Sequence, residues 1–257
     1  MRILVVPTTI ILYYIGLVAC QQQVLRETPI LRNASLSDAD DIASVIIAAF
    51  SPTPPWQYIY SFAKRHPKEH HRCIRSGIVR GFSDPSYHAQ VIEAPEESNL
   101  TVAAVAIWQQ KPSQNDMFLH GILRRWGASE QRQTCADCNK GQCEHRDLNV
   151  TRALDLERKS IVATRKYVDE PFGPDQLYLN TLCAHPDFQL QGAGTRLVKS
   201  GIEAGRRKNV NVTLIALPTS ESFYVHVGFD SMQNFTIATV DEDGLFRYNV
   251  MAYNFTR

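Results

Sequence analysis

The sequence predicts an α/β (α+β) domain in which helices flank a central sheet. Strand-like and helical segments alternate over residues 177–229, which favours a crossover connection between strands. Two β-rich runs separated by a polar turn lie upstream, at 86–109, and predict a hairpin. With 44% hydrophobic and 21% charged residues, the chain has the composition of an ordinary globular protein. We therefore expect a single domain over residues 29–257, with an insertion at 111–152, where the pattern is weak.

The first half of this domain should be largely helical before the hairpin. Apolar residues at helical spacing follow Ser37, which resembles an N-cap with Asp40 three residues later. The proline-rich run 51–55 should end that helix. The elements expected here are a strand at 29–33, a helix at 37–50, a helical region at 56–81 interrupted near Pro67, and strands at 86–93 and 100–109.

In the second half, strands and helices alternate more regularly. On the helix that begins at Gly192, the apolar residues Leu197, Val198 and Ile202 fall on one face. The elements expected are a helix at 153–168 that ends before Pro171, a strand at 177–184, the helix from Gly192, a strand at 210–217, a short helix at 222–227, and final strands at 232–240 and 245–254.

The first twenty residues differ from the rest. Arg2 is followed by an uncharged run over 3–19, which is typical of a secretory signal peptide. The run is short for a spanning helix, which needs about 20 apolar residues. An uncleaved signal anchor is the alternative, and only in that form do we expect membrane contact. Since the net charge is +1, neither nucleic acid nor an anionic membrane surface is expected as a main partner.

Six asparagines lie in Asn-x-Ser/Thr sequons, which accept glycans only in the secretory pathway. Chance alone would give roughly one or two at average Ser and Thr usage. The sequence therefore predicts a glycoprotein that is secreted or resides in the secretory pathway, with a cytoplasmic location as the alternative. The six sequons start at Asn33, Asn99, Asn149, Asn211, Asn234 and Asn254.

A strand that ends at Ala184 is followed by a turn and a helix that starts on small residues. The amides of a helix's first turn have no internal partner and favour an anion, which glycines allow to approach closely. A dinucleotide fingerprint would need a small residue where Leu197 stands. A P-loop would need a lysine and a hydroxyl where Thr195 and Arg196 stand.

The Gln-x-x-Gly-x-Gly spacing of Gln189, Gly192 and Gly194 instead resembles the acetyl-CoA pyrophosphate loop of the GNAT superfamily of N-acetyltransferases. The run from Ser222 to Phe229 is similar to that family's second motif, a short helix with a tyrosine followed by Gly-Phe. The resemblance implies a mixed, mostly antiparallel sheet with a strand–pyrophosphate loop–helix core. It also implies acetyl-CoA as co-substrate and no required metal. The residues expected to bind the cofactor are Leu182, Cys183 and Ala184 on the strand and Gln189, Leu190, Gln191, Gly192, Ala193, Gly194 and Thr195 in the loop.

By the same resemblance, Tyr224 is the candidate general acid, because a hydroxyl beside the thioester sulfur can protonate the departing thiolate. The strand positions where some relatives place a His or Glu base hold Tyr178 and Asn180. Asn180 could hold a water that relays a proton. Trp56, Tyr58 and Tyr60 follow the first helix, where the family often builds its acceptor site.

The activity that the resemblance implies is transfer of an acetyl group from acetyl-CoA to an amine of a small molecule. Two alternatives stay open: a non-catalytic domain that binds an acyl-CoA or another ligand, and a protein or peptide N-acetyltransferase.

Four potential soft ligands follow one another closely in Cys135, Cys138, Cys143 and His145. They could form a zinc loop, although His145 follows closely for a closed tetrahedron. In an oxidising compartment, disulfides that include Cys73 are the alternative.

Overall fold

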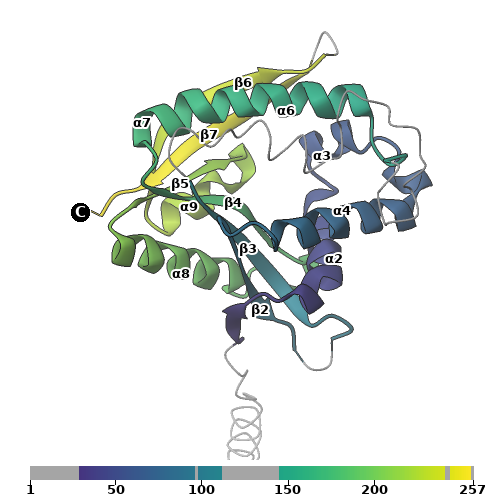
Figure 1. Cartoon of the computed structure of the whole chain (residues 1–257), viewed down its shortest axis with the longest axis horizontal. Helices are drawn as coiled ribbons and strands as arrows, with labels where there is room; N and C mark the ends of the chain where they lie inside the picture. Colours follow the sequence, from purple (N-terminus) through teal and green to yellow (C-terminus); the bar gives the residue numbers. More distant parts are fainter. Residues whose placement is uncertain (1–28, 96–97, 112–144, 241–243, 256–257) are drawn as a thin grey trace, which may run out of the picture. The chain divides into compact units, whose positions relative to one another are not determined.

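The computed structural model describes residues 29–95, 98–111, 145–240 and 244–255. The described residues from Leu31 onward form one compact unit. Within the described part, its centre is a seven-stranded sheet in the order β1-β2-β3-β4-β5-β7-β6 (Figure 1). The strands are β1 (Leu31–Asn33), β2 (Tyr87–Glu93), β3 (Val102–Gln110), β4 (Gln176–Ala184), β5 (Asn211–Ala216), β6 (Phe229–Ala238) and β7 (Leu245–Tyr253).

Of the strand pairs in this sheet, β4 and β5 run parallel and the others antiparallel. The expected mixed, mostly antiparallel sheet is therefore confirmed. Helix α8 is the crossover between the parallel strands, which must be joined by a connection that leaves the sheet.

Helices cover both faces of the sheet. In Figure 1, α8 lies on one side of β3, and α2 and α4 lie on the other. α8 packs on Trp108, Leu177 and Leu179, while α2 and α4 pack on side chains from the opposite face, among them Val91 and Val105. The helices are α2 (Ala39–Phe50), α3 (Pro54–Ile59), α4 (Pro67–Gly81), α6 (Val150–Thr164), α7 (Glu170–Phe172), α8 (Ala193–Lys208) and α9 (Glu221–His226).

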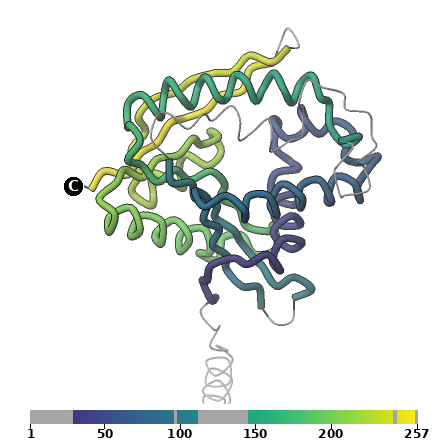
Figure 2. The backbone as a smooth tube through the Cα atoms, viewed as in Figure 1, coloured from purple at the N-terminus to yellow at the C-terminus, as the bar shows by residue number. Residues whose placement is uncertain are grey.

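The β6–β7 hairpin extends the sheet and lies beside α6, as the yellow and teal tubes of Figure 2 show. Leu156 of α6 packs there with Phe235, Ile237 and Val250 of the two strands. No helix among the described residues is both long and apolar enough to cross a bilayer.

The contact between α8 and the sheet depends on a glycine. A Cβ at Gly201 would lie 2.0 Å from the ring of Trp108 on β3, far inside van der Waals contact. Gly201 therefore lets α8 approach the strand closely enough for Leu197 and Val198 to be fully buried.

The first capping box lies two residues earlier than the sequence pattern predicted. Ser35, not Ser37, is the N-cap of a 3₁₀ turn over Leu36–Asp38 that precedes α2, and its backbone N–H donates to Asp38 Oδ2 at 2.7 Å. Arg32 of β1 fixes Asp38 with two hydrogen bonds of 2.8 Å. These bonds lower the pKa of Asp38 to about 2. Asp38 is itself the N-cap of α2, so the predicted cap Ser37 lies inside the turn that precedes the helix.

The helical segment before β4 also continues beyond its expected end. A π-helical turn over Arg165–Asp169 joins α6 to α7, in which Pro171 is an early residue. The backbone at Asp169 and Glu170 is already helical, and the amide of Glu170 donates to the carbonyl of Arg165, so Pro171 falls within a continuing helical segment. The prediction that the helix ends before Pro171 was wrong for this reason.

Candidate active site

The parallel strands β4 and β5 separate halfway along their length. They pair from Gln176 to Leu179 on β4 and from Asn211 to Leu214 on β5. Beyond this point β4 continues to Ala184 paired with β3, and β5 continues to Ala216 paired with β7. Residues 180–184 of β4 therefore have no strand partner on the β5 side within the described residues. Their backbone groups can pair with an extended ligand, as an added strand would.

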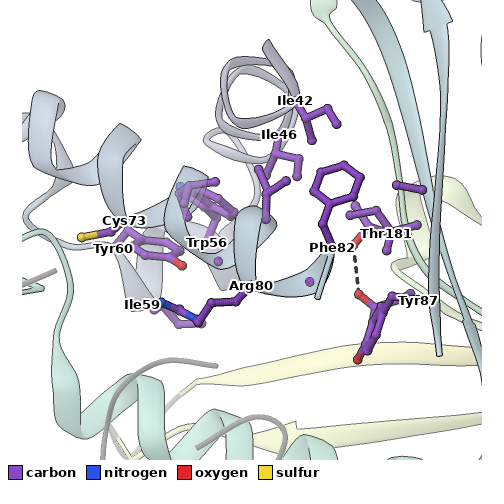
Figure 3. A pocket seen from close by; sticks show the side chains of 17 residues that line it. Ile42, Ile46, Trp56, Ile59, Tyr60, Cys73, Arg80, Phe82, Tyr87 and Thr181 are labelled. Atoms are coloured by element: carbon purple, nitrogen blue, oxygen red, sulfur yellow. Dashed lines mark hydrogen bonds between the residues drawn. The ribbon is translucent and has the colours of Figure 1, made fainter. Parts of the chain in front are cut away.

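A β-bulge marks the point of separation. The pairing with β3 shifts between Ile107↔Thr181 and Trp108↔Leu179, so Asn180 is the extra residue on β4. Asn180 and Thr181 consequently line the same cavity. The Thr181 hydroxyl donates to Asn180 Oδ1 at 3.1 Å, which is the dashed line in Figure 3.

The predicted anion-binding loop follows β4 directly. A short 3₁₀ turn over Pro186–Phe188 leads into four exposed residues, Gln189 to Gly192, and then into α8. The side-chain amide of Gln189 donates to the carbonyl of Ala184 at 3.2 Å, and that of Gln191 to the carbonyl of Asp187 at 3.2 Å. The first bond holds the loop against the end of the strand, and the second joins the loop to the 3₁₀ turn before it.

Gly192 is the N-cap of α8, with a φ of 82°. That left-handed conformation favours glycine, and the residue provides no capping side chain for the first-turn amides. The amides of Ala193, Gly194 and Thr195 are therefore in the first turn of a 16-residue helix that has no side-chain cap. Such amides favour a negatively charged group.

Tyr224 lies on α9, which follows β5, and its side chain is buried beside Phe223 and Phe229. Burial, and to a lesser extent the Cys183 thiol, raise the pKa of the Tyr224 phenol. Burial, with Tyr224 as a minor contributor, also raises the pKa of Tyr178. Tyr224 thus lies beside β4, near the unpaired segment, and it carries its proton at neutral pH.

A cavity of about 310 Å³ lies between α2, α3, α4 and the strands β2 to β4. In Figure 3, Trp56, Tyr60 and Arg80 lie at one end, and Phe82, Tyr87 and Thr181 lie at the other. Most of its lining is apolar or aromatic, and Arg80 is the only lining residue among those described that is charged at neutral pH. Its volume suits a small organic molecule.

The structure brings together most of the sequence-predicted site. Asn180 lies at the bulge, Trp56 and Tyr60 line the cavity, and the cofactor-binding candidates form β4 and its loop. Tyr58 does not line the cavity. It packs on Phe246 instead, and its hydroxyl accepts a hydrogen bond from the backbone of Val240 at 3.0 Å.

Sequence reasoning missed the contribution of α4. Cys73, Ile74, Gly77 and Ile78 line the cavity. Their spacing of three and four residues along a helix was the available signal, but nothing local indicated that this face of α4 meets a cavity. The cysteines at 135, 138 and 143 lie outside the described residues, and the structure describes only residues 145–152 and Lys111 of the expected insertion.

Residues 161–239 match the profile of the acetyltransferase (GNAT) domain family. This span contains β4, the loop, α8, β5, α9 and β6. No curated protein sequence matches the chain.

Among solved structures, the polyamine N-acetyltransferase of Drosophila melanogaster, which forms N-acetylagmatine, has a TM-score of 0.58 and 12% identity, over 89% of this chain and 100% of its own. An acetyltransferase from Corynebacterium glutamicum, related to histone acetyltransferase, has a TM-score of 0.53 and 15% identity, over 88% of this chain and 95% of its own. At such identities the similarity shows a shared fold.

Proposed function

Because the chain has the fold of GNAT N-acetyltransferases and carries that family's domain, we propose that it transfers an acetyl group from acetyl-CoA to an amine of a small molecule. The observation that carries this proposal is the separation of β4 from β5 directly before the uncapped start of α8. The unpaired end of β4 can form backbone hydrogen bonds with an extended chain, and the first amides of α8 can bind a pyrophosphate. Acetyl-CoA contains an extended arm followed by a pyrophosphate, in that order from its thioester end.

In the proposed reaction, the amine nitrogen attacks the carbonyl carbon of the thioester. The tetrahedral intermediate collapses with cleavage of the carbon–sulfur bond, and Tyr224 donates its proton to the departing sulfur. A phenol, with an ordinary pKa near 10, is protonated at neutral pH, as a proton donor must be, and burial of Tyr224 raises this pKa further.

The attacking amine must first lose a proton. No Asp, Glu or His is among the described residues that line the cavity. We therefore assign this proton to water, held by the side chains of Asn180 and Thr181 at the bulge. Their amide and hydroxyl groups can orient a water molecule without themselves accepting the charge.

The cavity also suggests which amines are accepted. Aromatic and aliphatic side chains dominate its walls, and Arg80, the one charged side chain among the described lining residues, is a cation. A polyamine would place several positive charges there, and none of the described lining residues is a carboxylate that could neutralise them, which is costly in an apolar site. The acceptor that fits is an amine attached to an apolar or aromatic group.

The test is CoA formation, measured by chromatography, with acetyl-CoA and three kinds of acceptor: an arylalkylamine, agmatine, and a peptide with a free N-terminus. We expect turnover to be highest with the arylalkylamine. Preference for agmatine or for the peptide would contradict the proposed class of acceptor but would still support acetyl transfer as the reaction.

CoA binding without turnover of any amine would favour the alternative, a domain that only binds the cofactor. The absence of a described carboxylate or imidazole in the cavity is the observation that favours this second candidate.

A further inference from the structure

Three side chains of types that bind metals lie close together, and one of them, Cys73, also lines the cavity. Cys73 is on α4, and His145 and Asp147 are on the segment that precedes α6. One ligand atom from each, a sulfur, an imidazole nitrogen and a carboxylate oxygen, lies within 4.8 Å of the other two. Cys73 is 3% exposed and Asp147 is 0% exposed.

The two carboxylate oxygens of Asp147 have different surroundings. Oδ2 lies 2.7 Å from Nδ1 of His70, one turn before Cys73 on α4. Oδ1 is buried and has no hydrogen-bond partner in the described part of the chain. It lies 3.9 Å from Nδ1 of His145, which is too long for a hydrogen bond. A fully buried carboxylate oxygen without a partner requires an explanation, because its desolvation is otherwise uncompensated.

We propose that Cys73, His145 and Asp147 bind a zinc ion. Thiolate, imidazole and carboxylate form a donor set that suits Zn²⁺. With metal–ligand bonds of about 2.0–2.3 Å, tetrahedral geometry places two ligand atoms roughly 3.3–3.8 Å apart, so small side-chain rotations close the site. One thiolate and one carboxylate also neutralise the charge of the ion.

His70 would orient the ligand Asp147 without itself binding the metal. Ligating carboxylates are commonly oriented by a hydrogen bond to their other oxygen. The contact from His70 Nδ1 to Asp147 Oδ2 provides that bond and turns Oδ1 toward His145.

The ion would join two segments that are distant in the sequence. Arg146 and Glu69 already connect the same segments through an ion pair of 2.7 Å. Cys73 and the following residues of α4 form a wall of the cavity. The proposed zinc therefore has a structural role: it fixes this wall relative to the start of α6, and it takes no part in acetyl transfer.

The test uses the full chain, reduced and freed of metal by dialysis against a chelator. We expect it to bind stoichiometric Zn²⁺ or Co²⁺, with a thiolate-to-cobalt charge-transfer band and a Tm that rises with zinc concentration. Cys73→Ser should remove the band. Asp147→Asn, nearly identical in shape, should keep the band at saturating cobalt but weaken affinity by about tenfold or more.

The control is Cys183→Ser, which removes the other buried cysteine of the described residues and should leave the band intact. If Cys73→Ser does not fold, His145→Gln replaces it, because His145 is partly exposed, and it should lower zinc affinity while retaining the fold.

The proposal is overturned by lack of stoichiometric binding to the reduced chain. It is equally overturned by unchanged affinity in the folded Cys73 or His145 variant, or by a disulfide at Cys73 in the protein as isolated.

Discussion

The proposed acid step depends on a single group, the hydroxyl of Tyr224. Tyr224→Phe keeps the ring against Phe223 and Phe229 and deletes this group. If the hydroxyl protonates the departing thiolate, turnover should fall roughly 10²- to 10⁴-fold with CoA affinity nearly unchanged. The loss should shrink for thioesters of more acidic thiols, which leave without a proton. The measurement is kcat of both proteins across such a series, and equal rates would remove Tyr224 from the mechanism.

Gly192 provides a second test at the scale of one residue. A Cβ added there meets no atom within 4 Å, so the space beside it is open to a ligand. Gly192→Asp and Gly192→Asn have nearly the same shape, and both residue types tolerate a positive φ better than most. Because only the aspartate repels a pyrophosphate, we expect it to weaken CoA binding by about tenfold or more relative to the asparagine variant.

Calorimetric titration of the two folded variants with CoA measures this difference. Equal affinities of the two variants would mean that the pyrophosphate of CoA does not bind beside Gly192.

Helix α4 is the element that should set the size of the acceptor. Gly77 lies in its middle, lines the cavity, and has open space where a Cβ would be. Gly77→Phe should fill part of the cavity and raise KM for the acceptor by about tenfold or more, with CoA affinity unchanged. Gly77→Ala is the matched control, because it favours the helix but adds only one methyl group.

Steady-state kinetics with the best amine of the panel measure both variants. If Gly77→Phe leaves the acceptor KM unchanged while the protein stays folded, the acceptor does not occupy this cavity.

At the scale of the whole molecule, the predicted signal peptide and the sequons lead us to expect a processed glycoprotein. Five of the sequon asparagines are exposed, whereas Asn149 is half-buried and caps α6 by accepting from the amide of Arg152 at 3.2 Å. Expression in a eukaryotic host should yield a chain that begins near Gln21 and loses mass on deglycosylation, with Asn149 the least modified site. Peptide mass spectrometry checks both points, and a full-length product without glycans would contradict the prediction.

The sequence by itself determined the elements and the local parts of the site. Caps, breakers and apolar periodicity act over three to eight residues, so a helix from Gly192 and strands on both sides of it could be predicted. The loop from Gln189 to Thr195 was predicted for the same reason, since its glycines and the start of α8 are contiguous in the chain.

Only the tertiary structure decided where distant segments meet. The separation of β4 from β5, the bulge at Asn180 and the cavity wall from α4 depend on strand register and helix packing. The same holds for Asp147, which meets His70 across 77 residues of sequence. Local pattern indicates which face of an element is apolar but not which element covers it, because the partner is selected by the packing of the whole core.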